Sequence, residues 1–329
     1  MTQEIQKLLL LGALVAPALG FCGSHTHLSA RAEEGEVKIN TFGYFGSIGP
    51  ENWAALDAAN SLCATGTRQS PINMAEGQFH MLSASDLTLE IPDQAEGAEF
   101  ENLGTTVEVV LEGKGGKMAL AGVEYELKQF HIHHPSEHLD NGTSVEMEVH
   151  NVFESADGQL AVIGVYVESD LGSPVTTVAK SRRAAAATSR RQEEAGAALP
   201  AGAPSFTIMA SSALPETEAV LSPMLETVFE KVEEVAAPGS KVTTGPLVFS
   251  EYVAAIMSGG FQSYSGSLTT PPCSEGVNWL VATQKLKVSA AAVRRVSSVV
   301  KFNSRITQNL LGEPNILNFA AVNSVTQAQ

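Results

Sequence analysis

The strongest constraint on the fold is a series of short segments with a strand-like pattern. In residues 87–91, 106–111 and 145–153, apolar and polar side chains alternate, so every second side chain lies on the same face of a β-strand. Residues 160–167 are apolar on both faces, which is typical of a central strand. Many short strands at close spacing predict a large, twisted and mainly antiparallel central sheet.

Helical patterns are scarce in this sequence. The best candidates span residues 52–59, 222–235 and 251–257. We therefore predict a mostly β (α+β) fold in which a few short helices lie at the periphery of the sheet. We expect one domain at 41–313 and a C-terminal tail at 314–329.

The N-terminus has the pattern of a secretory signal. The apolar run 8–21 is too short to span a bilayer, which needs roughly 20 residues. Ala18 and Gly20 are small residues at the two positions that a signal peptidase reads. We predict a signal at 1–20, a flexible lead-in at 21–40 and a secreted protein with no stable membrane anchor. A buried N-terminal helix is the alternative, and the glycines and the proline within the run argue against it.

One segment differs from the rest in composition. Residues 179–203 contain ten alanines in 25 residues and two pairs of arginines, without apolar periodicity. Such a segment cannot bury enough apolar surface to offset the entropy of ordering, so we predict a disordered insertion over about 176–215. The paired arginines fit either a processing site or a solvated loop.

The net charge argues against one class of function, and the cysteine content allows a disulfide. A formal net charge of −16 argues against nucleic-acid binding, which needs clustered Lys and Arg. The three cysteines are Cys22, Cys63 and Cys273, and secretion would allow a disulfide between two of them. The sequence alone does not pair them.

Three histidines have the spacing of a metal site. His131 and His133 are two apart in a predicted strand and therefore share a face. A turn through Asn141 and Gly142 precedes the next strand, which can bring His150 level with them. Three converging imidazoles suit zinc with an open fourth position. The alternative is a pair of surface histidines on one strand.

Two polar residues lie in phase with these histidines. Gln129 is two residues before His131, and Glu148 is two residues before His150, so both share the predicted metal face. Each can accept a hydrogen bond from the far ring nitrogen of a ligand and so hold its tautomer.

At this point the chain resembles an α-class carbonic anhydrase of the secreted eukaryotic type. The resemblance runs from Phe42 to Gln308, apart from the insertion. Its motifs are GPENW at 49–53, RQSPIN at 68–73, QFHIH at 129–133, SEH at 136–138, MEVH at 147–150, SLTTPPC at 267–273, NW at 278–279 and NSR at 303–305.

The resemblance implies reversible hydration of carbon dioxide to bicarbonate and a proton by zinc-bound hydroxide. It implies His131, His133 and His150 as Zn²⁺ ligands, with the backbone carbonyl of Asn303 behind His133. Thr269 would accept a hydrogen bond from the hydroxide and donate one to Glu137. A zinc-bound water with a pKa of about 7 is a general property of that family.

The resemblance also implies the substrate pocket. Thr270 would contact bicarbonate, and an apolar wall would hold carbon dioxide beside the metal. The wall residues would be Val152, Val162, Leu268, Val277 and Trp279. Their alternative interpretation is plain core packing.

Where fast members of the family carry a proton-shuttling histidine, this chain has Thr105. Threonine does not titrate near neutral pH, so we expect a slower enzyme that imidazole-type buffers accelerate. Glu108 lies on the same strand at a rim position that is usually neutral. His25 and His27 form a second His-x-His in the lead-in, where we expect adventitious metal binding rather than a function.

The resemblance carries further structural expectations. Cys63 and Cys273 would form a disulfide, and Ser70–Pro71 and Pro271–Pro272 would be cis. The sequence Asn141-Gly142-Thr143 is a possible N-glycosylation site. We expect a monomer or homodimer whose partners are small molecules.

Two other functions are weighed against hydration. A cupin metal oxygenase would share the His131-x-His-x3-Glu137 spacing, but the flanking glycines are misplaced and no second cupin motif follows. A non-enzymatic binding module related to the carbonic anhydrases would require a lost metal ligand, and all three histidines are present.

Overall fold

The computed structural model describes residues 36–170 and 218–318. The predicted signal at 1–20, residues 21–35 of the lead-in, the insertion at 176–215 and the end of the tail lie outside the described residues. Within the described part, none of the helices combines the length and apolar character needed to cross a membrane.

In the described residues the strands form a 13-stranded sheet and a small three-stranded sheet. The strands are β1 (Asn73–Met74), β2 (His80–Ser83), β3 (Leu87–Glu90), β4 (Glu99–Asn102), β5 (Val107–Val110), β6 (Lys117–Leu120), β7 (Val123–His133), β8 (Leu139–Asp140), β9 (Thr143–Ser144), β10 (Met147–Ser155), β11 (Leu160–Asp170), β12 (Val220–Leu221), β13 (Lys241–Thr243), β14 (Gly260–Ser267), β15 (Glu275–Ala282) and β16 (Leu286–Ser289).

The large sheet runs in the order β13-β4-β5-β7-β10-β11-β15-β14-β2, with β3, β6, β12 and β16 branching from it. Neighbours pair antiparallel except where β11 meets β15 and β16, and where β12 meets β16. The prediction of a mostly β fold with a mainly antiparallel sheet is therefore confirmed, and every segment predicted as a strand contains one.

The two faces of the central strands belong to different clusters. On β10, Met147, Val149 and Phe153 pack into the larger apolar core, together with side chains of the helices that cover this face. The intervening positions, including Val152, face a second cluster built from β10, β11, β14 and β15. The alternation read from the sequence thus separates a core face from the face that carries the histidines.

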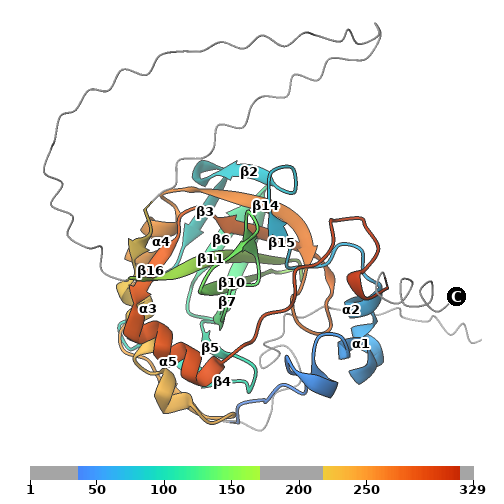
Figure 1. The fold of residues 1–329 in the computed structure, drawn as a ribbon. Helices are drawn as coiled ribbons and strands as arrows, with labels where there is room; N and C mark the ends of the chain where they lie inside the picture. Colours follow the sequence, from blue (N-terminus) through green and yellow to red (C-terminus); the bar gives the residue numbers. More distant parts are fainter. Residues whose placement is uncertain (1–35, 171–217, 319–329) are drawn as a thin grey trace, which may run out of the picture.

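The helices are short and peripheral (Figure 1). They are α1 (Trp53–Leu56), α2 (Leu62–Thr65), α3 (Pro223–Phe229), α4 (Phe249–Ile256) and α5 (Ala290–Val300), with 3-10 turns at η1 (Gly46–Ile48), η2 (Ala58–Ser61), η3 (Ala84–Asp86) and η4 (Val232–Val235). In Figure 1, α1 and α2 lie at the opposite end of the molecule from α3, α4 and α5.

The longest helix, α5, was not among the predicted ones. It begins at the N-cap Ser289, whose side chain accepts a hydrogen bond from the backbone N–H of Ala292. Only Ala292 and Val296 on it are buried, so its apolar stripe is narrow, and its valines favour strands. Packing against α3 and β16 therefore supports a helix that local pattern does not indicate.

Three local predictions are confirmed. Asn141 and Gly142 form the turn between β8 and β9, and both have positive φ, 47° and 86°. Cys63 and Cys273 are joined by a disulfide that ties α2 to the loop after β14. Ser70–Pro71 and Pro271–Pro272 are cis as expected, and His134–Pro135 is cis as well.

Candidate active site

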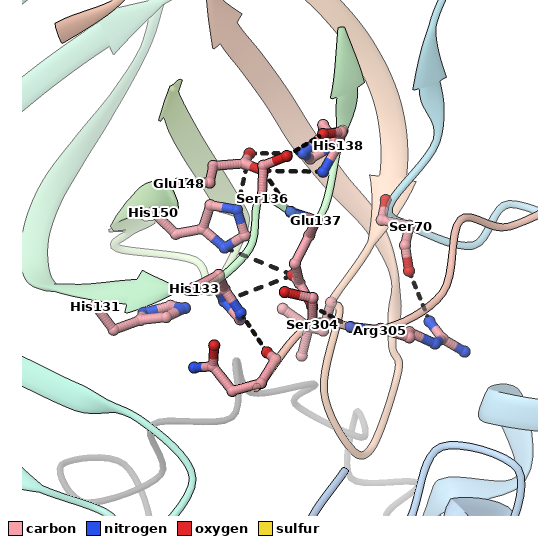
Figure 2. A network of polar contacts seen from close by, with 12 residues as sticks. Ser70, His131, His133, Ser136, Glu137, His138, Glu148, His150, Ser304 and Arg305 are labelled. Atoms are coloured by element: carbon pink, nitrogen blue, oxygen red, sulfur yellow. Dashed lines mark hydrogen bonds and ion pairs between the residues drawn. The ribbon is translucent and has the colours of Figure 1, made fainter. Parts of the chain in front are cut away.

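Strand register brings the three histidines together. In the β7–β10 ladder His150 lies directly opposite His131, and Glu148 lies opposite His133. One ligand atom from each of the three rings lies within 4.8 Å of the others, and all three side chains are buried. Figure 2 shows the rings converging on one point. The predicted pairing of two strands therefore produces a candidate metal centre.

Each ring has an oxygen behind it. The Gln129 Oε1 lies 2.9 Å from Nδ1 of His131, and the carbonyl oxygen of Asn303 lies 2.8 Å from Nδ1 of His133. Because both oxygens are acceptors, each Nδ1 carries the proton and each Nε2 keeps its lone pair. Glu148 Oε1 lies 3.0 Å from Nε2 of His150. The nitrogens that remain are the ones available to a metal ion.

Burial keeps the imidazoles of His131 and His133 neutral. Desolvation, followed by repulsion from the neighbouring histidines, holds the pKa of His131 well below its usual value. Desolvation and His150 lower the pKa of His133 to about 3. A neutral imidazole is the metal-binding form. The Nε2 atom of His133 is buried without a hydrogen-bond partner, an orphaned acceptor that suits a cation.

Glu137 lies beside the cluster. Its Oε1 accepts a hydrogen bond from the backbone N–H of Arg305 at 2.8 Å, and its Oε2 lies 3.5 Å from Nε2 of His133. Burial raises the pKa of Glu137 to about 7, against the lowering effects of His150, the Arg305 N–H and the side chain of Thr269. The contact between Thr269 and Glu137 matches the predicted pair. The role of Arg305 was not predicted, since only folding brings its N–H here.

A buried hydrogen-bond chain runs away from the metal face through Glu148. His138 Nδ1 lies 2.7 Å from Glu148 Oε1, and its Nε2 lies 2.7 Å from the hydroxyl of Tyr264. That hydroxyl donates to Ser70 at 2.8 Å. Although burial alone would raise the pKa of Glu148, His138 and His150 hold it well below the usual value. Glu148 is thus a fixed carboxylate against His150.

The expected apolar wall is brought together. Its five residues are fully or almost fully buried and belong to one cluster: Val152, Val162, Leu268, Val277 and Trp279. The ring of Trp279 lies 4.8 Å from that of His150, so the cluster adjoins the histidines. Thr270, which follows Thr269 in the chain, is buried, and its hydroxyl oxygen has no hydrogen-bond partner.

Two residues that were predicted to lie at the rim of the site differ in their burial. Thr105 is half-buried, and its hydroxyl accepts a hydrogen bond from the Asn40 side chain at 2.6 Å. Glu108 was expected at the rim but is fully buried in β5, opposite His131 on one side and Glu101 on the other. Asn141 is exposed, as a glycosylation site requires.

Comparison with known proteins identifies the relatives of this chain. The family model for eukaryotic-type carbonic anhydrase matches residues 48–172 and 197–315. A carbonic anhydrase from Nostoc is 28% identical over 275 residues, covering 83% of this chain and 84% of the relative. Alpha carbonic anhydrase 3 of Arabidopsis thaliana is 26% identical, covering 82% and 80%.

Solved structures agree with the sequence relatives. The fungal alpha carbonic anhydrase of Aspergillus oryzae superposes with a TM-score of 0.68 at 32% identity, covering 86% of this chain and 99% of that one. An alpha carbonic anhydrase of Thermovibrio ammonificans gives 0.60 at 27% identity, covering 83% and 97%. These matches leave no place for the cupin alternative.

Proposed function

The chain belongs to the eukaryotic-type carbonic anhydrase family and is a carbonic anhydrase, and on that premise we propose that His131, His133 and His150 hold a zinc ion for the reversible hydration of carbon dioxide. The observation that carries the proposal is the cluster itself. Three buried imidazoles present their free nitrogens to one point, and each is supported by an oxygen from behind.

The donor set fits zinc. Three nitrogen ligands with one open position are typical of catalytic zinc sites, whereas oxygen-rich sites suit calcium and magnesium. Zinc bound there would lower the pKa of a water molecule and so supply the nucleophile at neutral pH. Gln129, Asn303 and Glu148 keep the rings in the orientation and tautomer that binding needs.

Thr269 and Glu137 would orient the attacking oxygen. A hydroxyl that donates its proton to the Glu137 carboxylate can only accept a hydrogen bond from that oxygen. The lone pair of the oxygen is then aimed at the carbon of carbon dioxide. The backbone N–H of Thr269 would stabilise the negative charge that develops on the product, and Thr270 would contact bicarbonate.

The apolar cluster would hold the substrate. Carbon dioxide has no net charge or hydrogen-bond donor, so a wall of apolar side chains beside the histidines can hold it without an ordered polar contact. Its members are Val152, Val162, Leu268, Val277 and Trp279. Their continuity with the ring of His150 through Trp279 supports this role over plain core packing.

The proton released by hydration would leave slowly. Thr105 has no titrating group, and its hydroxyl is already engaged by Asn40. We propose an active enzyme whose turnover in weak buffer is limited by proton export and rises with added imidazole. Secretion is supported by the disulfide between Cys63 and Cys273, since such bonds persist in oxidising compartments.

The test is zinc stoichiometry together with stopped-flow carbon dioxide hydration at two buffer strengths, on the wild type and His131→Ala. We expect one zinc per chain and buffer-dependent hydration in the wild type, and neither in the variant. A wild type that binds no zinc and hydrates no carbon dioxide would favour the non-enzymatic binding module.

A further inference from the structure

Strand β11 contains a glycine among larger apolar residues. Gly164 lies inside the run LAVIGVYV at 160–167, is buried, and pairs with β10 on one side and with β15 on the other. A glycine inside a central strand weakens it, because glycine loses more backbone entropy on folding and has no side chain to pack. Such a residue often marks a place where another group approaches the backbone closely.

The backbone conformation does not require glycine at this position. The φ of Gly164 lies outside the left-handed region that favours glycine, whereas the φ of Gly158, in the turn before the strand, is 82°. The extended backbone of a β-strand is open to any L-residue. The reason for the glycine is therefore the space that a side chain would occupy.

That space adjoins the carboxylate of Glu148. Gly164 lies directly opposite His150 in the β10–β11 ladder, two positions along from Glu148. A Cβ on Gly164 would lie 2.8 Å from Glu148 Oε1, which is closer than non-bonded atoms pack. It would also lie 3.6 Å from Val281 Cγ2 and 3.7 Å from Trp279 Cζ3, in ordinary contact. These two side chains leave a methyl group no room to move away from the oxygen.

Glu148 is also held in place. Its Oε2 accepts hydrogen bonds from the backbone N–H groups of Glu137 and His138, both at 2.9 Å. Its Oε1 lies 2.7 Å from His138 Nδ1 and 3.0 Å from His150 Nε2 (Figure 2). The oxygen that a methyl group would displace is therefore the one that both imidazoles contact.

We propose that Gly164 is a positioning residue of the metal centre, whose missing side chain leaves room for the Glu148 carboxylate to hold His150. The inference rests on the proposed function, because it treats His150 as a zinc ligand. Loss of an acceptor behind a ligand typically lowers metal affinity 10–100-fold. A methyl group at position 164 shifts the acceptor without removing it, so the expected loss is about tenfold, at the lower end of that range.

The test compares Gly164→Ala with Gly260→Ala as the matched control. Gly260 begins β14, at the end of that strand away from Thr269, and a Cβ there would also lie 2.8 Å from an oxygen, the carbonyl of Leu82. Both substitutions create an equally close contact, but only Gly164→Ala involves an atom of the metal centre. Both should lower the free energy of unfolding of the metal-free protein, measured in urea.

Zinc affinity separates positioning from packing. By competition with a chromogenic chelator, we expect Gly164→Ala to bind zinc about tenfold more weakly than the wild type, and Gly260→Ala to match the wild type. With Co²⁺ in place of zinc, the visible absorption spectrum, which reports ligand geometry, should change in Gly164→Ala alone. Wild-type affinity and spectrum in Gly164→Ala would overturn the inference, and so would an equal loss of affinity in both variants.

A second substitution tests whether the effect passes through Glu148. Glu148→Asp shortens the side chain by one methylene group and draws the carboxylate back from position 164. In that background Gly164→Ala should change zinc affinity less than about twofold, so the two effects should not add. The same tenfold loss in both backgrounds would contradict the inference.

The double variant also covers a failure of Gly164→Ala to fold. In that case, recovery of the fold in Gly164→Ala/Glu148→Asp would support the inference, and no recovery would contradict it. A wild type that binds zinc at the three histidines but hydrates no carbon dioxide would contradict the proposed function and leave the positioning role of Gly164 intact.

Discussion

The two faces of β7 and β10 are both buried, but one carries apolar side chains and the other carries histidines. On one face Phe130, Ile132 and Val149 pack into the larger core beneath the helices. On the other face His131 and His150 meet across the same pair of strands. The side chains alternate along a single backbone, so one set of strands carries both the core and the proposed metal site.

The comparison shows that the faces are held by different kinds of interaction. Apolar burial is non-directional and scales with area, roughly 25 cal/mol per Å², so its members can be exchanged for others of similar volume. Buried polar groups each need a partner in hydrogen-bond geometry, because an unsatisfied one costs about 1–3 kcal/mol. On the histidine face each residue therefore has to be of a particular type, whereas on the core face only the total apolar volume has to be kept.

The largest effect is expected on the polar face. His131→Ala should remove bound zinc and lower kcat/KM for hydration by more than about a thousandfold, beyond the 10–100-fold typical of a change behind a ligand. The readouts are metal analysis and stopped-flow hydration. His134→Ala, whose ring hydrogen-bonds Lys301 instead, is the control and should keep both. Full activity in His131→Ala would remove the proposed role of this residue.

The neighbouring residue tests the core face. Phe130→Ala removes a fully buried ring that packs edge-on against Phe249, and it should lower the free energy of unfolding by about 3–5 kcal/mol. Urea unfolding measures the loss. Zinc stoichiometry and kcat/KM of the folded protein should remain close to wild type. If Phe130→Ala lost zinc binding but kept its free energy of unfolding, the assignment of stability to the core face and of metal binding to the histidine face would be contradicted.

The oxygen behind a ligand should have an intermediate effect. Gln129→Leu keeps the approximate volume but removes the acceptor for His131 Nδ1–H. We expect zinc affinity to fall about 10–100-fold, measured by competition with a chromogenic chelator. Gln129→Glu keeps an acceptor at the same position and should lose less. Equal affinity in wild type and Gln129→Leu would show that this contact does not support the ligand.

The change of the free energy of unfolding with pH should also come from residues of the histidine face. The pKa of His133 is about 3 in the folded protein, below the 6.5 of an exposed histidine, so the unfolded chain takes up the proton first. In metal-free protein, His133 therefore does not lower the free energy of unfolding above pH 6.5, and that free energy decreases as the pH falls from 6.5 toward 3. His133→Gln should make that loss shallower by up to about 1.4 kcal/mol per pH unit, measured by urea unfolding at several pH values.

Glu137, whose pKa is raised to about 7, contributes an opposite slope above about pH 4.5, and its Oε2 lies 3.5 Å from His133 Nε2. The two proteins are therefore compared below pH 4.5, where this carboxyl group is protonated in both the folded and the unfolded chain. Phe130→Ala is the matched control, and its slope against pH should parallel that of the wild type. Parallel slopes for wild type and His133→Gln would contradict the assignment of a depressed pKa to His133.

The smallest effect is expected at the rim. Thr105→His replaces a hydroxyl that cannot titrate with an imidazole, and hydration in weak buffer should rise about tenfold. The gain should shrink as imidazole buffer is added, because the buffer already removes the proton. Stopped-flow hydration across a buffer series checks this, with Thr105→Asn as the control. A rate equal to wild type at every buffer strength would show that proton export is not limiting.

Much of this architecture could be predicted from local pattern and strand pairing. Alternation in 145–153 placed His150 and Glu148 on one face, and a turn at Asn141 and Gly142 indicated the pairing that sets His150 opposite His131. Such features depend on residues close in sequence or on neighbouring strands, where period two determines the face.

The remaining contacts join distant parts of the chain. The backbone N–H of Arg305 on Glu137 spans 168 positions, and the contact of Asn40 with Thr105 spans 65. The Arg305 donor carries no local signal because a backbone N–H exists at every non-proline position, and the side-chain amide of Asn40 finds Thr105 only once the chain has folded. The burial of Glu108 beside His131 follows likewise from the position of β5 between β4 and β7 rather than from its own sequence.

The central claim is that the histidine face of β7 and β10 forms one catalytic zinc site. The most direct measurement titrates metal-free protein with zinc while following carbon dioxide hydration. The account predicts that activity rises in proportion to added zinc and stops rising at one equivalent per chain. Hydration that persists at full rate in metal-free protein, or that never appears on saturation with zinc, would contradict it.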